Sequence, residues 1–403
     1  QDEAEGHAVR AGYLYSAVAD VAALTGDDSL LSAIDKIWEN VVEKKTYVQG
    51  GVGALGDGER YGKNYELPNA TAYNETCAAI SNIYWNHRMF LLHGDSKYID
   101  VLEKTLYNGM LSGIGLDGKS FFYTNAMQVR EGFGAGRVES TRSGWFECSC
   151  CPTNLARIIP SIPGYVYGQK NDDIYINLFI NSTTNLLIRN KPVEIIQQNN
   201  YPWEGNLVFL VSPSASTNFS LFVRIPGWAR EEAMPSGLYK FESAANSPIS
   251  IQVNGQPIEY KMQNGYAIIT RTWKRNDKLE VTLPMEVRRV VANDLIKENI
   301  GKISLQRGPL TYCAEWPDNH GKTSNIILPE GTRFTTEFKP DLLAGLTIIK
   351  GEAPAIVIRD AFNISTVTQA FTAIPYYSWA NRGKGEMMVW FPTRVKYLDL
   401  LPN

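Results

Sequence analysis

The N-terminal part of the chain, to about residue 170, carries apolar side chains at the spacing of helices. One set recurs at intervals of three and four residues, as on one face of an amphipathic helix: Leu30, Leu31, Ile34, Ile37, Trp38, Val41 and Val42. A second set with the same spacing is Val9, Tyr13, Ala17, Val21 and Leu24. The pattern predicts two amphipathic helices, each with one of these sets as its apolar face.

A short motif in this part of the chain occurs twice. Leu24-Thr25-Gly26-Asp27 is repeated further along as Leu92-His93-Gly94-Asp95. Glycine commonly ends a helix and aspartate commonly begins one. The repeat therefore predicts one helical hairpin used at two places, as in a solenoid of stacked helices or a closed α/α toroid.

From about residue 172 the apolar positions follow the pattern of β-strands. The β-rich runs are 174–180, 219–225, 249–253, 266–270 and 278–283. Turn residues such as Asn254-Gly255 separate them, which is typical of an antiparallel β-sandwich. A further β-rich segment, also expected to be sandwich-like, covers 291–403. We therefore expect a multidomain α + β protein with parts 1–170, 171–290 and 291–403.

Composition and charge narrow the classes of partner. The 403 residues are 44% hydrophobic and 20% charged with a net charge of -3, which is typical of a soluble globular protein and favours neither nucleic acid nor an anionic membrane as partner. No apolar stretch is long enough for membrane insertion. The acidic first residues lack the features of a signal peptide. Aromatic residues reach 11%, which suits stacking on sugars as well as a β-rich core.

Candidate chemistry begins with Cys148-Ser149-Cys150-Cys151-Pro152, which holds three of the five cysteines. Vicinal cysteines make poor disulfide partners, because their Cα atoms are only about 3.8 Å apart where a relaxed bridge needs roughly 5.5 Å. Pro152 is a favoured first residue of a helix, which would put Cys150 and Cys151 at a helix N-terminus. The helix dipole there stabilises thiolates. We expect Cys148 to be a neighbour of this site or a substitute ligand.

A second motif, Glu75-Thr76-Cys77, adds a carboxylate and another thiol. Side chains two positions apart diverge on a regular helix, so both can face one ion only if the helix begins there. Glu75, Cys77, Cys150 and Cys151 together supply the ligands that tetrahedral Zn²⁺ takes. Buried cysteines or a purely structural zinc are the alternatives. Four protein ligands leave no vacancy for a zinc-activated water, unless a ligating cysteine is itself the nucleophile.

With these motifs the chain resembles the zinc- and cysteine-dependent β-L-arabinofuranosidases of glycoside hydrolase family 127. The motifs that carry the resemblance, in order along both halves of the chain, are Gly6-His7-Ala8-Val9-Arg10, Glu59, Leu67-Pro68-Asn69, Glu75-Thr76-Cys77, Leu106-Tyr107-Asn108-Gly109, Cys150-Cys151-Pro152-Thr153-Asn154, Arg224-Ile225-Pro226-Gly227-Trp228 and Gln306-Arg307-Gly308-Pro309-Leu310. The resemblance implies an (α/α)6 catalytic barrel, of which this chain would hold only the second half, followed by β-sandwich domains.

The resemblance also implies a retaining mechanism and roles for individual residues. The nucleophile would be Cys150 and the general acid/base Glu59, with zinc held by Glu75, Cys77, Cys150 and Cys151. The substrate-binding residues would be His7, Glu103 and Tyr123. From its loop sequence alone, Glu59 is better interpreted as a solvated carboxylate, with Asp57 and Glu66 as competing candidates.

The leading hypothesis is a retaining exo-glycosidase that releases terminal β-L-arabinofuranosyl residues from plant oligosaccharides or polysaccharides. A rival within the family releases aceric acid from rhamnogalacturonan II, for which Arg10, Arg60 and Arg142 could form a cationic subsite. Other classes are a zinc hydrolase that attacks amides or esters through water, and a non-catalytic carbohydrate-binding scaffold with structural zinc. A plant-glycan substrate favours a periplasmic or extracellular location, whereas reduced thiolates also fit a cytoplasm.

Overall fold

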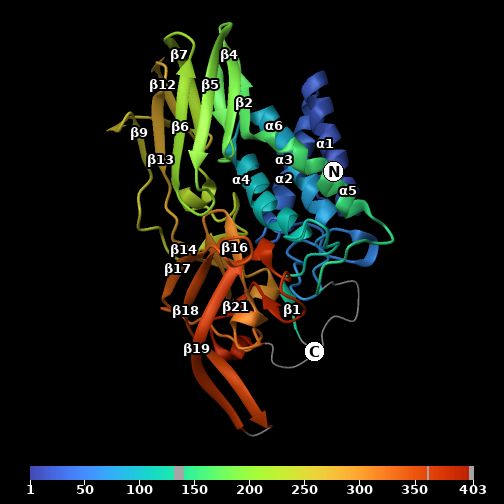
Figure 1. Ribbon diagram of the computed structural model, residues 1–403. Coiled ribbons are helices and arrows are strands. Elements are labelled where there is room, and N and C mark those ends of the chain that lie inside the picture. Colours follow the sequence, from blue (N-terminus) through green and yellow to red (C-terminus); the bar gives the residue numbers. More distant parts are fainter. Residues whose placement is uncertain (131–139, 361–362, 399–403) are drawn as a thin grey trace.

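A computed structural model describes residues 1–130, 140–360 and 363–398. In Figure 1 the helices gather at the right, two packed β-sheets lie at the upper left and a third sheet lies below them. The helices are α1 (Ala8–Thr25), α2 (Asp28–Lys44), α3 (Thr76–His93), α4 (Ser96–Lys104), α5 (Cys150–Ile158) and α6 (Pro163–Val166). Within the described ranges, no helix has the length and apolar character needed to cross a membrane.

The repeated hairpin is confirmed. Gly26 and Gly94 end α1 and α3 with φ values of 67° and 63°, in the left-handed region that glycine adopts without strain. Asp27 then accepts hydrogen bonds from the backbone N–H groups of Ser29 and Leu30, at 2.8 and 3.2 Å. Asp95 accepts a matching bond from Lys97 N at 2.9 Å. Both helix starts therefore use the same side-chain cap.

The predicted apolar face is right for α2 and wrong for α1. Helix α2 buries Ile34, Ile37, Trp38, Val41 and Val42. Helix α1 instead buries a face of mostly small residues, namely Ala8, Ala11, Gly12, Tyr15, Ser16, Ala19 and Ala22.

Close packing of α1 against α3 explains the difference. A Cβ atom at Gly12 would lie 2.3 Å from Ser81 Oγ, so the two helices approach too closely for large side chains. Beyond this point of closest approach, Tyr15 of α1 contacts Trp85 of α3 with ring centroids 4.9 Å apart, whereas Val21 and Leu24 remain 45% and 87% exposed.

The middle part of the chain forms the predicted β-sandwich. One sheet has the order β10 (Gln256–Pro257), β9 (Ser250–Val253), β13 (Asp277–Thr282), β6 (Asn206–Pro213), β5 (Lys191–Asn199) and β4 (Ser182–Ile188). The other has the order β11 (Lys261–Gln263), β12 (Tyr266–Trp273), β7 (Thr217–Arg224), β3 (Asp173–Ile176) and β2 (Tyr167–Lys170). Buried side chains from both sheets, including Phe209 and Leu221, share one core. Strand β3 pairs with β7 in parallel, and the other strand pairs described in these two sheets are antiparallel.

The last part of the chain contributes to one ten-stranded sheet. Its main order is β17 (Phe334–Lys339), β18 (Leu346–Asp360), β19 (Asn363–Pro375), β16 (Leu310–Glu315), β15 (Lys302–Arg307), β14 (Val287–Ala292) and β8 (Tyr239–Phe241), and the remaining strands are β1 (Gln128–Val129), β20 (Met387–Met388) and β21 (Phe391–Pro392). The sheet stays continuous because β16 pairs with β15, β19 and β20. Strand β1 comes from the helical part and pairs with β20, so the sheet also fixes the chain that leads to the site.

A buried ionic network joins α4 to the sandwich. The guanidinium of Arg224, which has no exposed surface, contacts Asp100 Oδ1 at 2.6 Å and Glu103 Oε1 at 2.5 Å. Glu103 also accepts hydrogen bonds from Tyr201 at 2.7 Å and from the indole of Trp228 at 3.3 Å. The carboxylate of Glu103 is thus fully used in holding the helices against the sheets.

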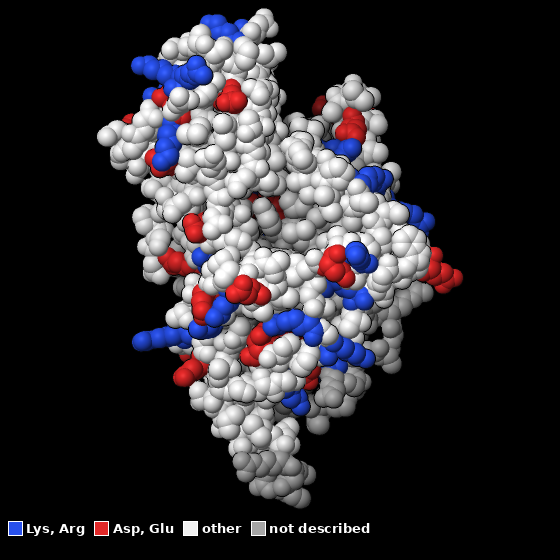
Figure 2. All heavy atoms as spheres, in the orientation of Figure 1, with Lys and Arg blue, Asp and Glu red and all other residues white. Residues whose placement is uncertain are grey.

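Charged side chains are mixed on the face seen in Figure 2. Lysine and arginine alternate with aspartate and glutamate over this face, and neither sign forms one continuous patch there. This distribution agrees with the small net charge of -3.

Candidate functional site

The start of α3 places Glu75 and Cys77 on one side of the helix, as predicted. Glu75 is the residue before the first turn, with φ and ψ of −61° and 137°, and the helix begins at Thr76. The preceding loop is fixed because Thr76 N donates to Tyr123 O at 2.9 Å and Thr76 Oγ1 donates to Phe122 O at 2.8 Å. Both site residues are buried, and the segment that carries Tyr123 lies directly beside them.

The start of α5 supplies the other two thiols. The prediction put Pro152 first in this helix, but the helix begins two residues earlier, at Cys150, with Ser149 before it. Proline is also tolerated within the first turn, where its missing N–H has no helical partner to lose. Cys150 and Cys151 therefore lie inside the first turn, where the helix dipole favours negative charge.

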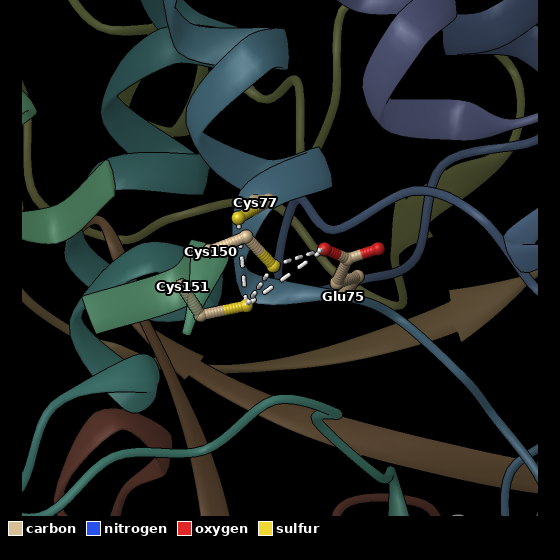
Figure 3. Close-up of side chains that lie close together, drawn as sticks. All are labelled: Glu75, Cys77, Cys150 and Cys151. Carbon is tan, nitrogen blue, oxygen red and sulfur yellow. Dashed lines mark hydrogen bonds between the residues drawn. The ribbon is translucent and has the colours of Figure 1, made fainter. Parts of the chain in front are cut away.

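The four side chains form one compact group (Figure 3). Figure 3 shows the carboxylate of Glu75 on one side of three sulfur atoms that come from α3 and α5. One ligand atom from each of Glu75, Cys77, Cys150 and Cys151 lies within 4.8 Å of the others. The Sγ atoms of Cys77 and Cys151 are 3.4 Å apart and those of Cys150 and Cys151 are 3.8 Å apart. Glu75 Oε1 lies 3.6 Å from Cys150 Sγ and 3.8 Å from Cys151 Sγ.

Cys150 differs from the other three groups in the direction of its pKa shift. Hydrogen bonds from the thiols of Cys151 and Cys77 hold the pKa of Cys150 well below its ordinary value. The pKa values of Cys77 and Cys151 are raised, by the hydrogen bonds with Cys150 and by burial respectively. Burial, with the nearby charge of Cys150, raises the pKa of Glu75 to about 8.

The donor set fits a zinc ion. A tetrahedron with Zn–S bonds of about 2.3 Å has edges of about 3.8 Å, close to the observed separations of the sulfur atoms. Glu75 Oε2 is buried and has no hydrogen-bond partner among the described residues, which leaves the carboxylate free to bind a cation. Three thiols and one carboxylate favour zinc over magnesium or calcium.

Glu59 lies in a second polar group beside the first. It ends the short 3₁₀ turn η1 (Asp57–Glu59) with φ of 51°, an uncommon conformation for a residue with a side chain. Tyr73 donates a hydrogen bond to Oε1 of Glu59 at 2.7 Å, and His7 Nε2 lies 2.9 Å from Oε2. The backbone bridge between His7 and Arg60 brings the histidine to this position.

Tyr123 connects the two groups. Its hydroxyl lies 3.4 Å from Glu59 Oε1, and it is also one of the hydrogen-bond donors that lower the pKa of Cys150, after the thiols of Cys151 and Cys77. His7, Glu59 and Tyr123 are therefore brought together with Cys150, as the sequence led us to expect. Sequence reasoning missed Tyr73, because nothing in its surroundings distinguishes it from the other 20 tyrosines of the 21 in the chain.

Two further predicted residues lie elsewhere. Glu103 is committed to the buried network with Arg224, which gives no support to a contact with sugar. Arg142 donates to the backbone oxygens of Ser112 and Tyr377 and stacks on Phe122, so its guanidinium is committed as well. Cys148 is exposed and lies two residues before Cys150, the first residue of α5.

Comparison with family models covers nearly the whole chain. The model described as "Beta-L-arabinofuranosidase, GH127 catalytic domain" matches residues 1–164. The models for the GH127 middle domain and the GH127 C-terminal domain match residues 173–285 and 287–392.

Individual relatives agree with these matches. The chain is 34% identical to a curated "Non-reducing end beta-L-arabinofuranosidase" of Bifidobacterium longum subsp. longum, over 96% of this chain and 59% of that protein. A solved GH127 β-arabinofuranosidase superimposes with a TM-score of 0.94 at 47% identity, over 99% of this chain and 62% of the other. A GH127 β-L-arabinofuranosidase from Geobacillus stearothermophilus T6 gives a TM-score of 0.89 at 39% identity, over 97% of this chain and 61% of the other. The chain thus spans about three fifths of the length of these relatives.

Proposed function

This chain belongs to glycoside hydrolase family 127, and on that premise we propose that it is the catalytic part of a retaining β-L-arabinofuranosidase with a cysteine nucleophile. The observation that carries the proposal is the position of Cys150. It is half-buried, whereas Glu75, Cys77 and Cys151 are fully buried, so Cys150 offers the accessible sulfur of the group. It is also the member of the group whose pKa is lowered, by hydrogen bonds from the thiols of Cys151 and Cys77.

In the proposed reaction, Cys150 attacks the anomeric carbon while Glu59 protonates the departing oxygen. Glu59 then takes a proton from the water that displaces the sulfur, so two displacements retain the configuration. The hydroxyl of Tyr123 contacts Glu59 and Cys150 alike, which supports the view that both act on one bound sugar. His7 and Tyr73 hold the two carboxylate oxygens of Glu59 in place.

Glu75, Cys77, Cys150 and Cys151 would hold a zinc ion in this account. When bound, zinc would stabilise the Cys150 sulfur as a thiolate, which would favour its role as nucleophile and as leaving group. The buried and unpartnered Oε2 of Glu75 supports this assignment.

We further propose that α1 to α5 form part of an (α/α)6 toroid. Large apolar side chains remain exposed on neighbouring helices of this part, including Leu14 and Leu24 on α1 and Leu91 on α3. Additional helices packed on these side chains would complete the toroid and remove the apolar surface from water. We keep 1–170, 171–290 and 291–403 as the proposed domain division.

For the substrate, we propose a terminal β-L-arabinofuranosyl residue of a plant glycan, taken up from a periplasmic or extracellular space. The names of the relatives support the sugar, and the name of the curated relative also supports action at a non-reducing chain end. An acidic sugar such as aceric acid needs a free cation in the subsite, and of the three arginines named for that role Arg142 is already committed to backbone oxygens and Phe122.

The test uses the full polypeptide and an aryl β-L-arabinofuranoside. We expect release of the aryl alcohol, and ¹H NMR should identify the first sugar product as β-L-arabinofuranose. Turnover should be lost in Cys150→Ser. Inversion of configuration, or substantial turnover by Cys150→Ser, would point to a water nucleophile and contradict the proposal.

A further inference from the structure

Two short stretches of the chain, 73–76 and 123–125, lie side by side at the site and are joined by antiparallel backbone contacts. On the first stretch, Tyr73 donates a hydrogen bond to Glu59, the proposed acid/base. The same stretch carries Glu75, whose carboxylate lies beside the three sulfur atoms in Figure 3. A side chain that fixes this stretch therefore acts on both polar groups of the site.

The buried side chain of Asn125 fixes the backbone on both sides of Glu75. Asn125 is 1% exposed, and its Nδ2 donates to Asn74 O at 2.9 Å and to Thr76 Oγ1 at 3.0 Å. A backbone carbonyl can only accept a hydrogen bond, so the nitrogen of the amide, and not its oxygen, has to face Asn74. The hydroxyl of Thr76 in turn donates to Phe122 O at 2.8 Å. One amide thus holds the residue before Glu75 and the residue after it.

Asn74 needs this support because of its backbone conformation. Its φ is 48°, in the left-handed region that a residue with a side chain adopts only at a cost in energy. Its N–H donates to Gly53 O at 2.8 Å and its carbonyl accepts from Asn125, so both polar backbone groups of Asn74 are held. The turn at Asn74 sets the direction in which the side chain of Glu75 leaves the backbone. Loss of the Asn125 amide would therefore remove one of the two backbone contacts that fix this direction.

We propose that Asn125 is a positioning residue, which keeps Glu75 directed at the three thiols and Tyr73 directed at Glu59. It acts through the backbone of 73–76 and so links the metal group to the acid/base. The inference rests on the proposed function, because zinc and the acid/base both belong to that proposal. Partners that orient a metal ligand typically contribute about 10- to 100-fold to metal affinity or activity.

The test compares Asn125→Leu with the wild type, both in the full polypeptide. Leucine has a similar size but cannot donate a hydrogen bond. We therefore expect the Kd for zinc, measured by competition with a chromogenic chelator, to rise roughly 10- to 100-fold. At saturating zinc, kcat on an aryl β-L-arabinofuranoside should fall about 10-fold or more with KM little changed, because the acid/base is misplaced and the sugar still binds.

Asn319→Leu is the matched control. Asn319 has no exposed surface, and its Nδ2 donates to the backbone oxygens of Glu315 and Thr372, each at 2.9 Å, in the ten-stranded sheet. The control should lower Tm, as Asn125→Leu does, but leave the Kd for zinc and kcat at their wild-type values. A purely structural role for Asn125 would give this same result in both variants.

A second pair of variants changes the same contact from its other end. Thr76→Val removes the hydroxyl that accepts from Asn125, and it should raise the Kd for zinc. Thr76→Ser keeps the hydroxyl and should bind zinc nearly as tightly as the wild type. This pair tests the inference even if Asn125→Leu does not fold.

Two results would overturn the inference and leave the proposed function standing. One is a Kd for zinc and a kcat in Asn125→Leu equal to those of the wild type, and the other is an equal Kd in Thr76→Val and Thr76→Ser. A wild-type polypeptide that binds no zinc would instead contradict the proposed metal group, and the inference with it. Zinc binding without release of the sugar would contradict the proposed activity alone, because the zinc affinities still test the position of Glu75.

Discussion

Tyr73 donates a 2.7 Å hydrogen bond to Oε1 of Glu59, the proposed acid/base. The opposite oxygen lies 2.9 Å from His7 Nε2, so the carboxylate is held at both ends. Glu59 also has a positive φ of 51°, a conformation that needs support from its surroundings. Tyr73 therefore acts as a positioning residue: it holds the carboxylate of Glu59 in place, and Glu59 remains the proposed acid/base.

Tyr73→Phe removes this support and leaves the thiol group intact. A hydrogen bond to a charged group contributes about 1.5–3 kcal/mol, so we expect kcat to fall roughly 10- to 100-fold with KM little changed. Steady-state kinetics on an aryl β-L-arabinofuranoside measures both constants. Tyr312→Phe, which removes a 2.9 Å bond to Thr347 O in the ten-stranded sheet, is the matched control and should keep its kcat. An unchanged kcat in Tyr73→Phe would remove the positioning role.

Cys77→Ser should separate metal binding from folding. The thiol is fully buried in the group, so its loss should weaken zinc binding by more than about 100-fold, the upper end of the effect of losing an outer-shell partner. Metal analysis after dialysis measures the zinc retained per chain. Cys313→Ala, a change of a buried cysteine in β16, should retain zinc in full. Equal zinc in both variants would show that the ion binds elsewhere.

Glu103→Gln tests whether Glu103 contacts the sugar or stabilises the fold. Removing one partner of a buried ion pair typically costs 3–5 kcal/mol, roughly, because the other charge stays buried. We therefore expect a clear fall in Tm with KM unchanged in the folded fraction. Glu280→Gln, which alters an ion pair with Lys278 on the surface, is the control and should change Tm very little. A raised KM at an unchanged Tm would instead support the prediction from sequence that Glu103 contacts the sugar.

Because the amine of Lys104 is buried, we expect the free energy of unfolding to depend on pH. Its amine is buried and donates to Gln306 Oε1 at 2.6 Å, and burial lowers its pKa to about 7 from an ordinary 10.5. Between these values the unfolded chain binds more protons than the folded protein, so stability rises with pH from about 7 upward. Below about 7 both states are protonated and the penalty is constant.

The measurement is the change in Tm between pH 7 and pH 9. Wild type should gain about 2 kcal/mol, or roughly 2 °C, relative to Lys104→Met, in which this titration is absent. The difference between the two proteins cancels the titration of other groups. An equal change in Tm between pH 7 and pH 9 in wild type and Lys104→Met would show that the pKa of Lys104 is not lowered in the folded protein.

Much of the fold and half of the site follow from local rules. The caps at Asp27 and Asp95 are encoded within a few residues, and so is the helix start that turns Glu75 and Cys77 to one side. The thiol group could be predicted because two short motifs, Glu75-Thr76-Cys77 and Cys150-Cys151, hold the residue types that zinc takes.

The remaining features depend on contacts between distant segments. The buried face of α1 was missed because closeness to α3 at Gly12 selects small residues over hydrophobic ones. Tyr73 reaches Glu59 only because the loops before α3 fold back on each other. The spacing of residues in the sequence gives no sign of this contact. Glu103 looks like a site carboxylate until Arg224, from a distant strand, is seen to neutralise it.

The measurement that tests the central claim most directly is a peptide mass map of the Glu59→Ala variant of the full polypeptide after incubation with an aryl β-L-arabinofuranoside. An activated aryl group leaves without acid assistance, whereas the second step still needs a base, so the intermediate should accumulate. The account predicts a pentosyl group on Cys150, within peptide 143–157, and none in a Glu59→Ala, Cys150→Ala double variant. Release of the aryl alcohol with no adduct on that peptide would contradict the cysteine nucleophile.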